Sequence, residues 1–413
     1  MMKTERIKNY WKQATEDWNY IFTKELKTIF RDGGVLIFFF LVPLAYPLLY
    51  SFIYTDEVVR DVPIAVVDAD GSTTSRLYLR HLDATPDVHI VSYCADMHEA
   101  ENLVRRRDAY GIVYIPESFT ADLTAGRQTH VSAFSDMSGL LYYKSVLLAN
   151  TNVSLDMNAK IKVERAGSST DEETKVVEHP IAYEEVNLYN PAAGFASFLI
   201  PAVLVLIIQQ TLLLGVGMIT GTARENNLFR HPVPIDRHYT GLLRIVFGKA
   251  MAYLMIYLPI SVYVLGVIPR LFRLNQLGAP STLGLFAIPL LLACIFFAMT
   301  VGGLMRRRET CILLIVFTSV PLLFISGISW PGASIPEFWH YVGYLFPSTF
   351  GINGFVKINN MGARLVDVRP EWDALWVQAI AYFLTACLVY RNDILGARRR
   401  FAARLDALRH KTC

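Results

Sequence analysis

Six apolar runs without charged residues dominate the pattern of hydrophobic and polar positions along this chain of 413 residues. A helix rises about 1.5 Å per residue, so roughly 20 apolar residues suffice to cross the hydrocarbon layer of a membrane. One run stands near the N-terminus and five follow a long water-compatible stretch, which predicts a polytopic α-helical membrane protein in a 1+5 arrangement. We expect its six transmembrane helices near residues 35–54, 195–219, 250–268, 283–304, 311–330 and 374–390.

The water-compatible stretch alternates short β-rich runs with helix-like segments. Such an order predicts a small α/β domain in which helices pack on a sheet. A long helix is expected from 137 to about 162, and residues 168–175 have the composition of a mobile loop. We expect the strands in VPIAVVD (62–68), VHIVSY (88–93), AYGIVYIP (109–116) and HVSAFSD (130–136).

Lys and Arg collect before the first span, in the segment after the last span, and in the loops at 220–244 and 306–308. Because cytoplasmic loops carry the excess of these residues, both termini are predicted to be cytoplasmic and the α/β domain extracytoplasmic. The net charge of +3 hides this asymmetry. The basic tail is better suited to membrane lipid headgroups than to nucleic acid, which we do not expect as a partner.

These patterns divide the chain into five parts. Residues 15–32 predict an interfacial helix that carries Lys24, Glu25, Lys27 and Arg31 on its polar side, either as a simple anchor or as a docking element. The uncharged stretch 338–356 contains Pro and Gly, which favours a broken segment packed on protein. The parts are the N-terminus 1–32, the first span 33–55, the extracytoplasmic domain 56–190, the five-helix domain 191–390 with its inside loop 220–244 and outer re-entrant segment 335–360, and the tail 391–413.

The motifs of enzymes and cofactor sites are missing from the sequence. Residues 241–249 lack the glycine spacing of a phosphate-binding loop, and His98 is not followed by a second histidine in the spacing of a zinc protease. Asp68 and Asp70 resemble the start of a calcium loop, but its acidic twelfth position is Leu79, so capping of the next helix is favoured. No catalytic residue, metal site or cofactor of its own is expected, and an intramembrane enzyme is disfavoured.

The predicted spans contain no ionisable residue, whereas proton- or sodium-coupled carriers usually keep one there. If the protein moves a compound uphill, we expect the energy to come from an attached engine. Gln209 and Gln210 are the most polar side chains of the spans, and Asn353 lies in the re-entrant segment. We regard the three as candidates for a translocation path, although interhelical hydrogen bonding explains the glutamines at least as readily.

Several segments resemble a known family in the order in which they occur. KELKTIFRDGGVLIFFFLVPLAYPLL is similar to the N-terminal signature of ABC-2 type permeases. VPIAVVDADGS, AYGIVYIPESF and HVSAFSD are similar to the extracytoplasmic domain of the drug and lipid exporter branch. SGISWPGASIPEFWHYVGYLFPSTFGINGF resembles its C-terminal re-entrant stretch. The resemblance covers nearly the whole chain.

The resemblance implies a dimer of permeases, each bound to a separate ATP-binding cassette ATPase that carries ATP and Mg. By position, Lys24, Glu25 and Arg31 belong to the elbow helix, and Arg224 with Glu225 to the coupling loop. The chain departs from the family where it continues as NNLFRHPVPI. We expect replacement of either glutamate by alanine to uncouple ATPase binding while leaving membrane insertion intact.

The sequence therefore predicts the permease subunit of an ABC exporter in a bacterial inner membrane, which moves a hydrophobic or amphipathic compound outward. The alternative is a cell-surface receptor or scaffold without transport. The sequence leaves open the substrate, whether the second permease is an identical chain or a paralogue, and whether a periplasmic adaptor or an outer-membrane channel takes part.

Overall fold

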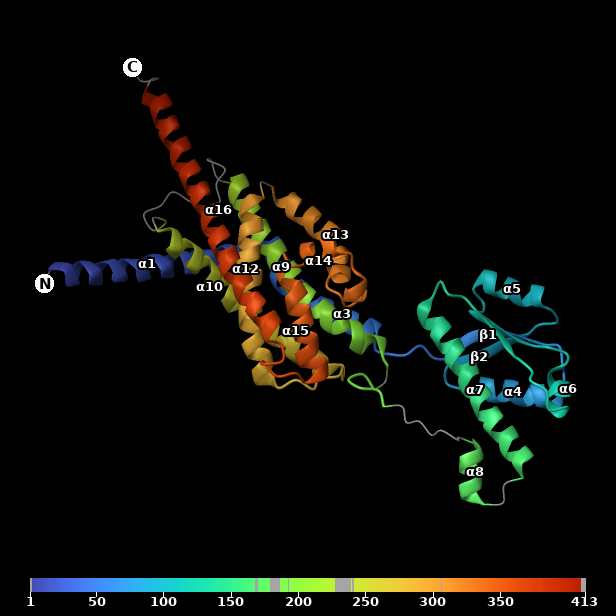
Figure 1. The fold of residues 1–413 in the computed structure, drawn as a ribbon. Coiled ribbons are helices and arrows are strands. Elements are labelled where there is room, and N and C mark those ends of the chain that lie inside the picture. Colours follow the sequence, from blue (N-terminus) through green and yellow to red (C-terminus); the bar gives the residue numbers. More distant parts are fainter. Residues whose placement is uncertain are drawn as a thin grey trace. The chain divides into compact units, whose positions relative to one another are not determined.

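The computed structural model describes residues 2–167, 170–178, 186–191, 193–226, 239, 241–305 and 307–409 (Figure 1). The chain forms two compact units. The helical unit consists of Met1–Glu57 and Asn187–Cys413, and the α/β unit consists of Val58–Val186.

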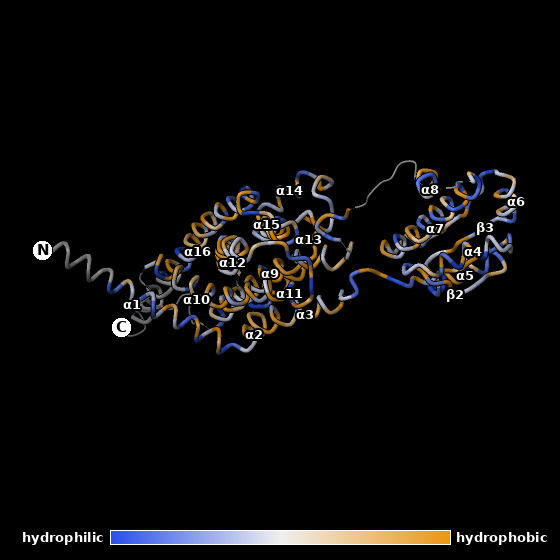
Figure 2. Tube along the Cα trace, turned by 90° about the horizontal axis from the view of Figure 1, so that it is seen from below, coloured by the Kyte–Doolittle hydropathy of each residue, from blue (hydrophilic) through white to orange (hydrophobic). Residues whose placement is uncertain are grey.

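Six helical segments among the described residues are long and apolar enough to cross a membrane, one before the α/β unit and five after it. Figure 2 shows that hydrophobic residues predominate along the helices of the helical unit. The six candidate spans are Gly33–Ile53, Phe195–Glu225, Leu242–Leu271, Pro280–Leu304, Arg308–Ile325 and Arg369–Gly396.

Four of these spans differ from the sequence-based prediction by at least five residues at one end. The second ends at Glu225 rather than at residue 219, and the fifth ends at Ile325 rather than at residue 330. The third begins at Leu242 rather than at residue 250, and the sixth covers Arg369–Gly396 rather than 374–390. Both predictions ended at charged residues, because an unpaired charge is costly in a membrane. In the structure, Lys249 lies inside the third span with a carboxylate partner, so the helix continues past it. The candidate span thus includes an ionisable residue that the predicted span 250–268 leaves out.

The first span is interrupted in its helical winding. α1 (Met2–Arg31) is longer than the helix expected at 15–32, and Asp32 then caps α2 (Gly33–Leu36). A π-helical turn, η1 (Ile37–Leu41), precedes α3 (Val42–Ile53), whose first turn contains Pro43. Because proline has no backbone N–H to donate, the wider π turn accommodates the bond that the α-helix would otherwise lose.

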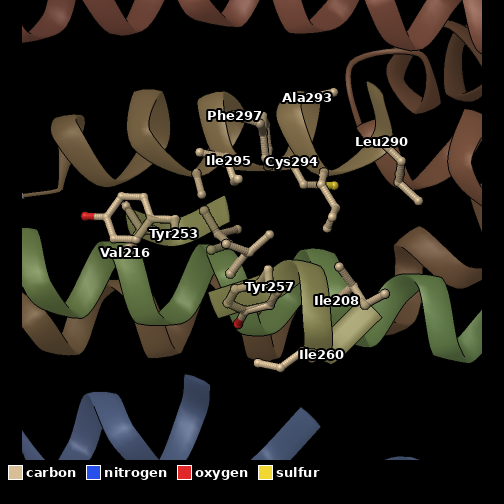
Figure 3. Close-up of a cluster of buried hydrophobic side chains, with 14 of the residues drawn as sticks. Ile208, Val216, Tyr253, Tyr257, Ile260, Leu290, Ala293, Cys294, Ile295 and Phe297 are labelled. Carbon is tan, nitrogen blue, oxygen red and sulfur yellow. The ribbon is translucent and has the colours of Figure 1, made fainter. Parts of the chain in front are cut away.

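The centre of the helical unit is α9 (Phe195–Asn226), which is the most buried of the six candidate spans. It packs against α3, α12 (Pro280–Leu304) and α13 (Arg308–Ile325), while α16 (Arg369–Arg409) packs on α12. α10 (Leu242–Val262) continues through η2 (Tyr263–Val267) into α11 (Ile268–Leu271). Figure 3 shows part of the core, in which Ile208 and Val216 of α9 lie among side chains of α10 and α12.

The segment predicted to be re-entrant is a pair of helices. After the short turn η3 (Gly332–Ser334), α14 covers Glu337–Gly343 and α15 covers Pro347–Met361. The break falls just before Pro347, as expected for the residue that precedes a proline. α15 packs on α9, α12 and α16, and ten of its residues are buried, so it is enclosed by protein.

The α/β unit contains a four-stranded sheet in the order β2-β1-β3-β4. β1 runs parallel to β2 and β3, whereas β4 is antiparallel to β3. All four strands lie within the segments predicted from the sequence. Their bounds are β1 Val62–Asp68, β2 Val88–Tyr93, β3 Gly111–Ile115 and β4 Ser132–Ser135.

Helices cover both faces of this sheet. Ile64 and Val66 of β1 pack with α4 (Thr73–Asp83) and α7 (Leu140–Ala166), whereas Ala65 and Val67 pack with α5 (Met97–Arg106). This alternation follows from the two-residue period of a strand. α6 (Phe119–Thr124) contributes Phe119 to the α4 side.

The stretch after α7 corrects one prediction. Residues 168–175 were expected to form a loop, but α8 covers Asp171–Glu178, and 168–169 lie outside the described residues. The acidic composition that suggested a loop also suits a helix N-terminus, because carboxylates are favoured near the positive end of the helix dipole.

The turn that resembled a calcium loop is closed by its own hydrogen bonds. Asp68 accepts from the Gly71 N–H at 3.0 Å and the Ser75 hydroxyl at 2.8 Å, and Ser72 caps α4. Asp70 accepts from the Thr120 hydroxyl at 2.6 Å. The carboxylates therefore organise the turn. The expectation that they cap the next helix is wrong, because Ser72 takes that position while Asp68 and Asp70 bond to the turn and to Thr120.

Candidate functional site

Buried or half-buried ion pairs gather at one end of the helical bundle. The most buried of these pairs joins α1 to α10, where Glu25 accepts from the Lys249 ammonium at 2.7 Å and from the Tyr253 hydroxyl. Both charged side chains are at least nine-tenths buried. A buried charge is tolerated only with such a partner, so this pair fixes α1 against α10.

A second pair joins the same two helices. Asp17 of α1 accepts from Arg244 of α10 at 2.5 Å, and Asp17 is buried. Both acids lie on α1 and both bases lie on α10, with apolar Ile21 buried between them in sequence. The elbow helix is therefore held along about two of its turns by specific charge pairing, which exceeds what a simple lipid anchor requires.

Asp32 connects three elements where the first span begins. It accepts from the Gly34 N–H at 3.0 Å as the cap of α2 and from the Arg308 guanidinium of α13 at 3.1 Å. The Thr222 hydroxyl of α9 lies 3.5 Å from the same carboxylate. One side chain thus orients α2, α9 and α13 together.

The coupling-loop candidates also form contacts between helices. Arg224 of α9 donates to Asp393 of α16 at 2.9 Å and to the carbonyl of Gly303. Glu225 is exposed and accepts from the Arg308 N–H at 3.2 Å. Residues 227–238 of the predicted coupling loop, including most of NNLFRHPVPI, lie outside the described residues.

The five predicted coupling residues fall into two groups. Glu25 and Arg224 take part in pairs inside the bundle, whereas Arg31 and Glu225 are exposed and Lys24 is half-buried beside the Tyr20 and Tyr239 rings. The expectation that Glu25 lies on the polar side of its helix is wrong, because its carboxylate is matched by Lys249 across the helix interface. Direct contact with a partner protein is therefore open to Lys24, Arg31 and Glu225.

The sequence did not reveal the partners of these charged residues. Arg244, Lys249 and Arg308 pair with acids of the first segment, and Asp393 pairs with Arg224. A usable signal was present. Each of these residues borders or enters an apolar run, three at its start and Asp393 after its end, and opposite charges at one membrane face can pair.

The three candidates for a translocation path do not form one cluster. Gln209 accepts from the Ser348 N–H of α15 at 2.6 Å, which supports the packing interpretation for this residue. Asn353 donates to the Ser326 and Thr349 carbonyls at the end of α13 and within α15. Gln210 instead lines a pocket on another side of α9.

This pocket has a volume of about 390 Å³ and lies between η1, α3, α9 and α13. Its lining is predominantly apolar and aromatic, including Phe38, Tyr46 and Tyr50. Gln210 is buried, and neither atom of its amide has a hydrogen-bond partner among the described residues. An apolar pocket with an unpaired amide can orient a ligand that is mostly hydrophobic and carries one polar group.

No group of three His, Cys, Asp or Glu side chains within the described residues could hold a metal ion. Cys94, Cys294, Cys311 and Cys387 are free thiols. Six apolar helical segments with α9 at their centre, charge pairs at one end and a hydrophobic pocket beside α9 define a multi-pass membrane protein of transporter type.

Comparison with known proteins identifies the family. The model of the ABC-2 family transporter proteins matches residues 34–388, and the chain therefore belongs to this family. It is similar to the linearmycin resistance permease protein LnrN of Bacillus subtilis, with 22% identity over 361 residues that cover 80% of this chain and 88% of the relative. Proteins of this family are membrane subunits without an ATPase site, and the family implies partner ATPase subunits.

Proposed function

We propose that this chain is the membrane-spanning subunit of an ABC exporter, which moves a hydrophobic or amphipathic compound out of the cytoplasm or inner membrane. ATP would be hydrolysed by a separate ATPase chain. The pocket around Gln210 carries this proposal, because an apolar cavity with one unpaired amide suits such a compound. The similarity to a resistance permease supports outward movement.

The position of the pocket suits a ligand that arrives from the lipid. Its walls are the central helix α9 and the two least buried spans, α3 and α13. Exposed Val316 and Phe317 on α13 face either lipid or a second permease, identical or paralogous. A compound dissolved in the membrane would thus reach Gln210 after crossing only this peripheral layer.

The ion pairs suggest how ATP hydrolysis would be transmitted. The ends that carry Asp32, Arg224 and Arg308 would face the cytoplasm, together with both termini. The α/β unit would then lie outside, where a periplasmic adaptor could bind it. Because α1 is tied to α10 by two pairs, an ATPase that pushes on half-buried Lys24 or exposed Arg31 would move both helices together.

Transport into inside-out membrane vesicles tests this function. Vesicles that contain the chain and an ATPase encoded beside it should accumulate the amphipathic dye rhodamine 6G when ATP is added. The Gln210→Leu variant should reduce the initial rate severalfold, because it removes the amide that orients the dye. Gln13→Leu, an exposed change on α1, should leave the rate unchanged.

The exporter and the receptor or scaffold predict different results in this assay. Failure of several amphipathic dyes to accumulate, together with the absence of any ATPase in affinity-purified material, would favour the receptor or scaffold. Accumulation that is equal in wild type and Gln210→Leu would retain the exporter but remove the pocket from its path.

A further inference from the structure

A second cavity lies at the end of the helical unit opposite the ion pairs. It has a volume of about 440 Å³ and is enclosed by the end of α13, the α14–α15 pair and the first turn of α16. Hydrophobic side chains, among them Ile325, Ile335 and Phe350, form much of its lining. The polar side chains that line it include His340, Tyr344, Asn353 and Glu371.

Glu371 is the unusual member of this lining. Glu371 is only 9% exposed, and its Oε1 accepts from the Lys357 ammonium at 2.6 Å. Its Oε2 is buried and has no hydrogen-bond partner within the described chain. Leaving a buried carboxylate oxygen without a donor is costly, and folded proteins rarely do so. Glu371 lines the cavity, so a small rotation of its carboxylate would present Oε2 to a donor there.

The other polar groups of the cavity leave mainly acceptors for a ligand. Both hydrogen bonds of Asn353 donate its amide N–H groups, to the Ser326 carbonyl at 3.2 Å and the Thr349 carbonyl at 2.9 Å. No described residue donates to its carbonyl Oδ1. His340 and Tyr344 are paired with each other at 2.7 Å. A ligand that donates hydrogen bonds would therefore match the acceptors of this site.

We propose that this cavity binds the protonated primary amine of an organic ligand, with the ammonium group at Glu371 and the apolar part against Ile325 and Phe350. A primary ammonium carries three N–H donors, so it can satisfy Glu371 Oε2 and a second acceptor such as Asn353 Oδ1 at once. Its charge strengthens the bond to a carboxylate. An anion would instead be repelled by Glu371.

The electrostatic balance of the site supports a cation. Lys357 pairs with Oε1 of Glu371, the oxygen other than the unpaired Oε2. The Lys357 side chain is almost half exposed, so water screens part of its charge. The carboxylate charge is thus only partly compensated on the cavity side. Tyr344 and Phe350, whose rings stack 5.1 Å apart, add aromatic surface that favours a neighbouring cation.

This site is separate from the Gln210 pocket and does not depend on the proposed transport. The full-length chain in lipid nanodiscs can be titrated with 2-phenylethylamine and with 2-phenylethanol, with ligand-observed NMR as the readout and empty nanodiscs as the blank. We expect the amine to bind about tenfold more tightly than the alcohol, as for a charge-assisted bond. Equal affinity for the two ligands would overturn the proposal, since a cavity that holds only water or apolar groups would not distinguish them.

A variant locates the binding. Glu371→Gln keeps the shape of the side chain but removes its charge, so it should abolish the preference for the amine and leave the affinity for the alcohol unchanged. Glu337→Gln makes the same change at an exposed carboxylate of α14 and should retain the preference. A preference that survives Glu371→Gln would refute the assignment.

Should Glu371→Gln fail to fold, wild-type protein still tests the site. A primary amine that carries a diazirine can be photo-cross-linked and its attachment mapped by mass spectrometry. Labels on peptides from 325–353 or 369–372 that 2-phenylethylamine displaces would support the proposal. Labelling only outside these segments would overturn it.

Discussion

Individual charged residues determine how the helical unit is joined at its charged end. Glu25 and Lys249 are 224 positions apart in sequence and form a buried pair that Tyr253 completes. Breaking such a pair by removing one partner leaves an uncompensated charge, whereas removing both can be nearly neutral. This asymmetry distinguishes a structural pair from an exposed contact with another protein.

Glu25→Gln should therefore destabilise the docking of α1 by about 3–5 kcal/mol. The double variant Glu25→Gln/Lys249→Met should recover most of this loss, because neither charge remains buried alone. The midpoint of thermal unfolding in detergent measures both, and exposed Glu16→Gln on α1 is the control. If the single and double variants both behave like Glu16→Gln, the pair does not hold α1.

Asp70 provides a pH-dependent contact in the α/β unit. Burial raises the pKa of its carboxyl, but hydrogen bonds from Ser72 and Thr120 lower the pKa further, so the net shift is downward. A carboxyl with a lowered pKa in the folded state stabilises that state above its ordinary pKa of about 3.9. This contribution is lost as the pH falls through the folded-state pKa.

Thr120→Val should accordingly reduce hydrogen-exchange protection of the α6 segment at neutral pH. The difference from wild type should shrink when the pH falls below the pKa of Asp70. Thr124→Val removes a hydroxyl that bonds only to backbone carbonyls, so its effect should not change with pH. A pH-independent difference for Thr120→Val would contradict the role of Asp70.

At the scale of elements, small residues allow α9 to lie at the centre of the bundle. A side chain at Gly217 would collide with Cys311 of α13, and one at Gly302 of α12 would press on the backbone of Gly217. At Gly221, a Cβ atom would lie 2.8 Å from the backbone nitrogen of Arg308. Close approach of helix backbones through small residues is the usual means of packing helices in membranes.

Gly221→Ala should therefore lower stability by about 1–3 kcal/mol, because the neighbouring backbone cannot move aside as a flexible side chain could. Gly284→Ala, in α12, places its methyl group in open space and should cause no loss. Alanine is in fact the better helix former. Thermal unfolding of the two variants in parallel measures the difference, and equal midpoints would show that α9 and α13 can separate slightly at no cost.

At the scale of the whole molecule, the surface that would receive an ATPase is narrower than the sequence indicated. The burial of Glu25 and the pairing of Arg224 leave Glu225 as the exposed acidic candidate among the predicted coupling residues. Its carboxylate also accepts from the first turn of α13, so a partner that binds Glu225 would contact the end of that helix as well.

Glu225→Ala should reduce the amount of ATPase that co-purifies with the tagged chain severalfold while leaving membrane insertion intact. An exposed charge at an interface rim mainly affects association. Glu337→Ala at the opposite end of the helical unit should retain the ATPase. Undiminished ATPase in the Glu225→Ala sample would remove this residue from the coupling surface.

Local patterns along the chain were sufficient to predict the helices and strands named below. The apolar runs, the four β-rich segments and Pro347 predicted the spans, the strands and the broken re-entrant segment, because each depends on neighbouring residues and a fixed period. The ends of the third and sixth spans were misplaced, because a charge at the end of an apolar run can stay within the helix when a partner pairs with it. Residues 171–178 were not recognised as helical, because an acidic stretch suits both a loop and a helix N-terminus.

The sequence by itself determined a polytopic helical protein with six candidate membrane spans and an α/β unit between the first two, since hydrophobicity and strand periodicity are properties of contiguous residues. Only the tertiary structure decided that Glu25 is buried against Lys249, that Gln209 packs while Gln210 lines a pocket, and that Glu371 has an unpaired oxygen in a cavity. These outcomes depend on which face of each helix meets a neighbour distant in sequence. The rotation of each helix about its own axis is set by packing across the whole unit.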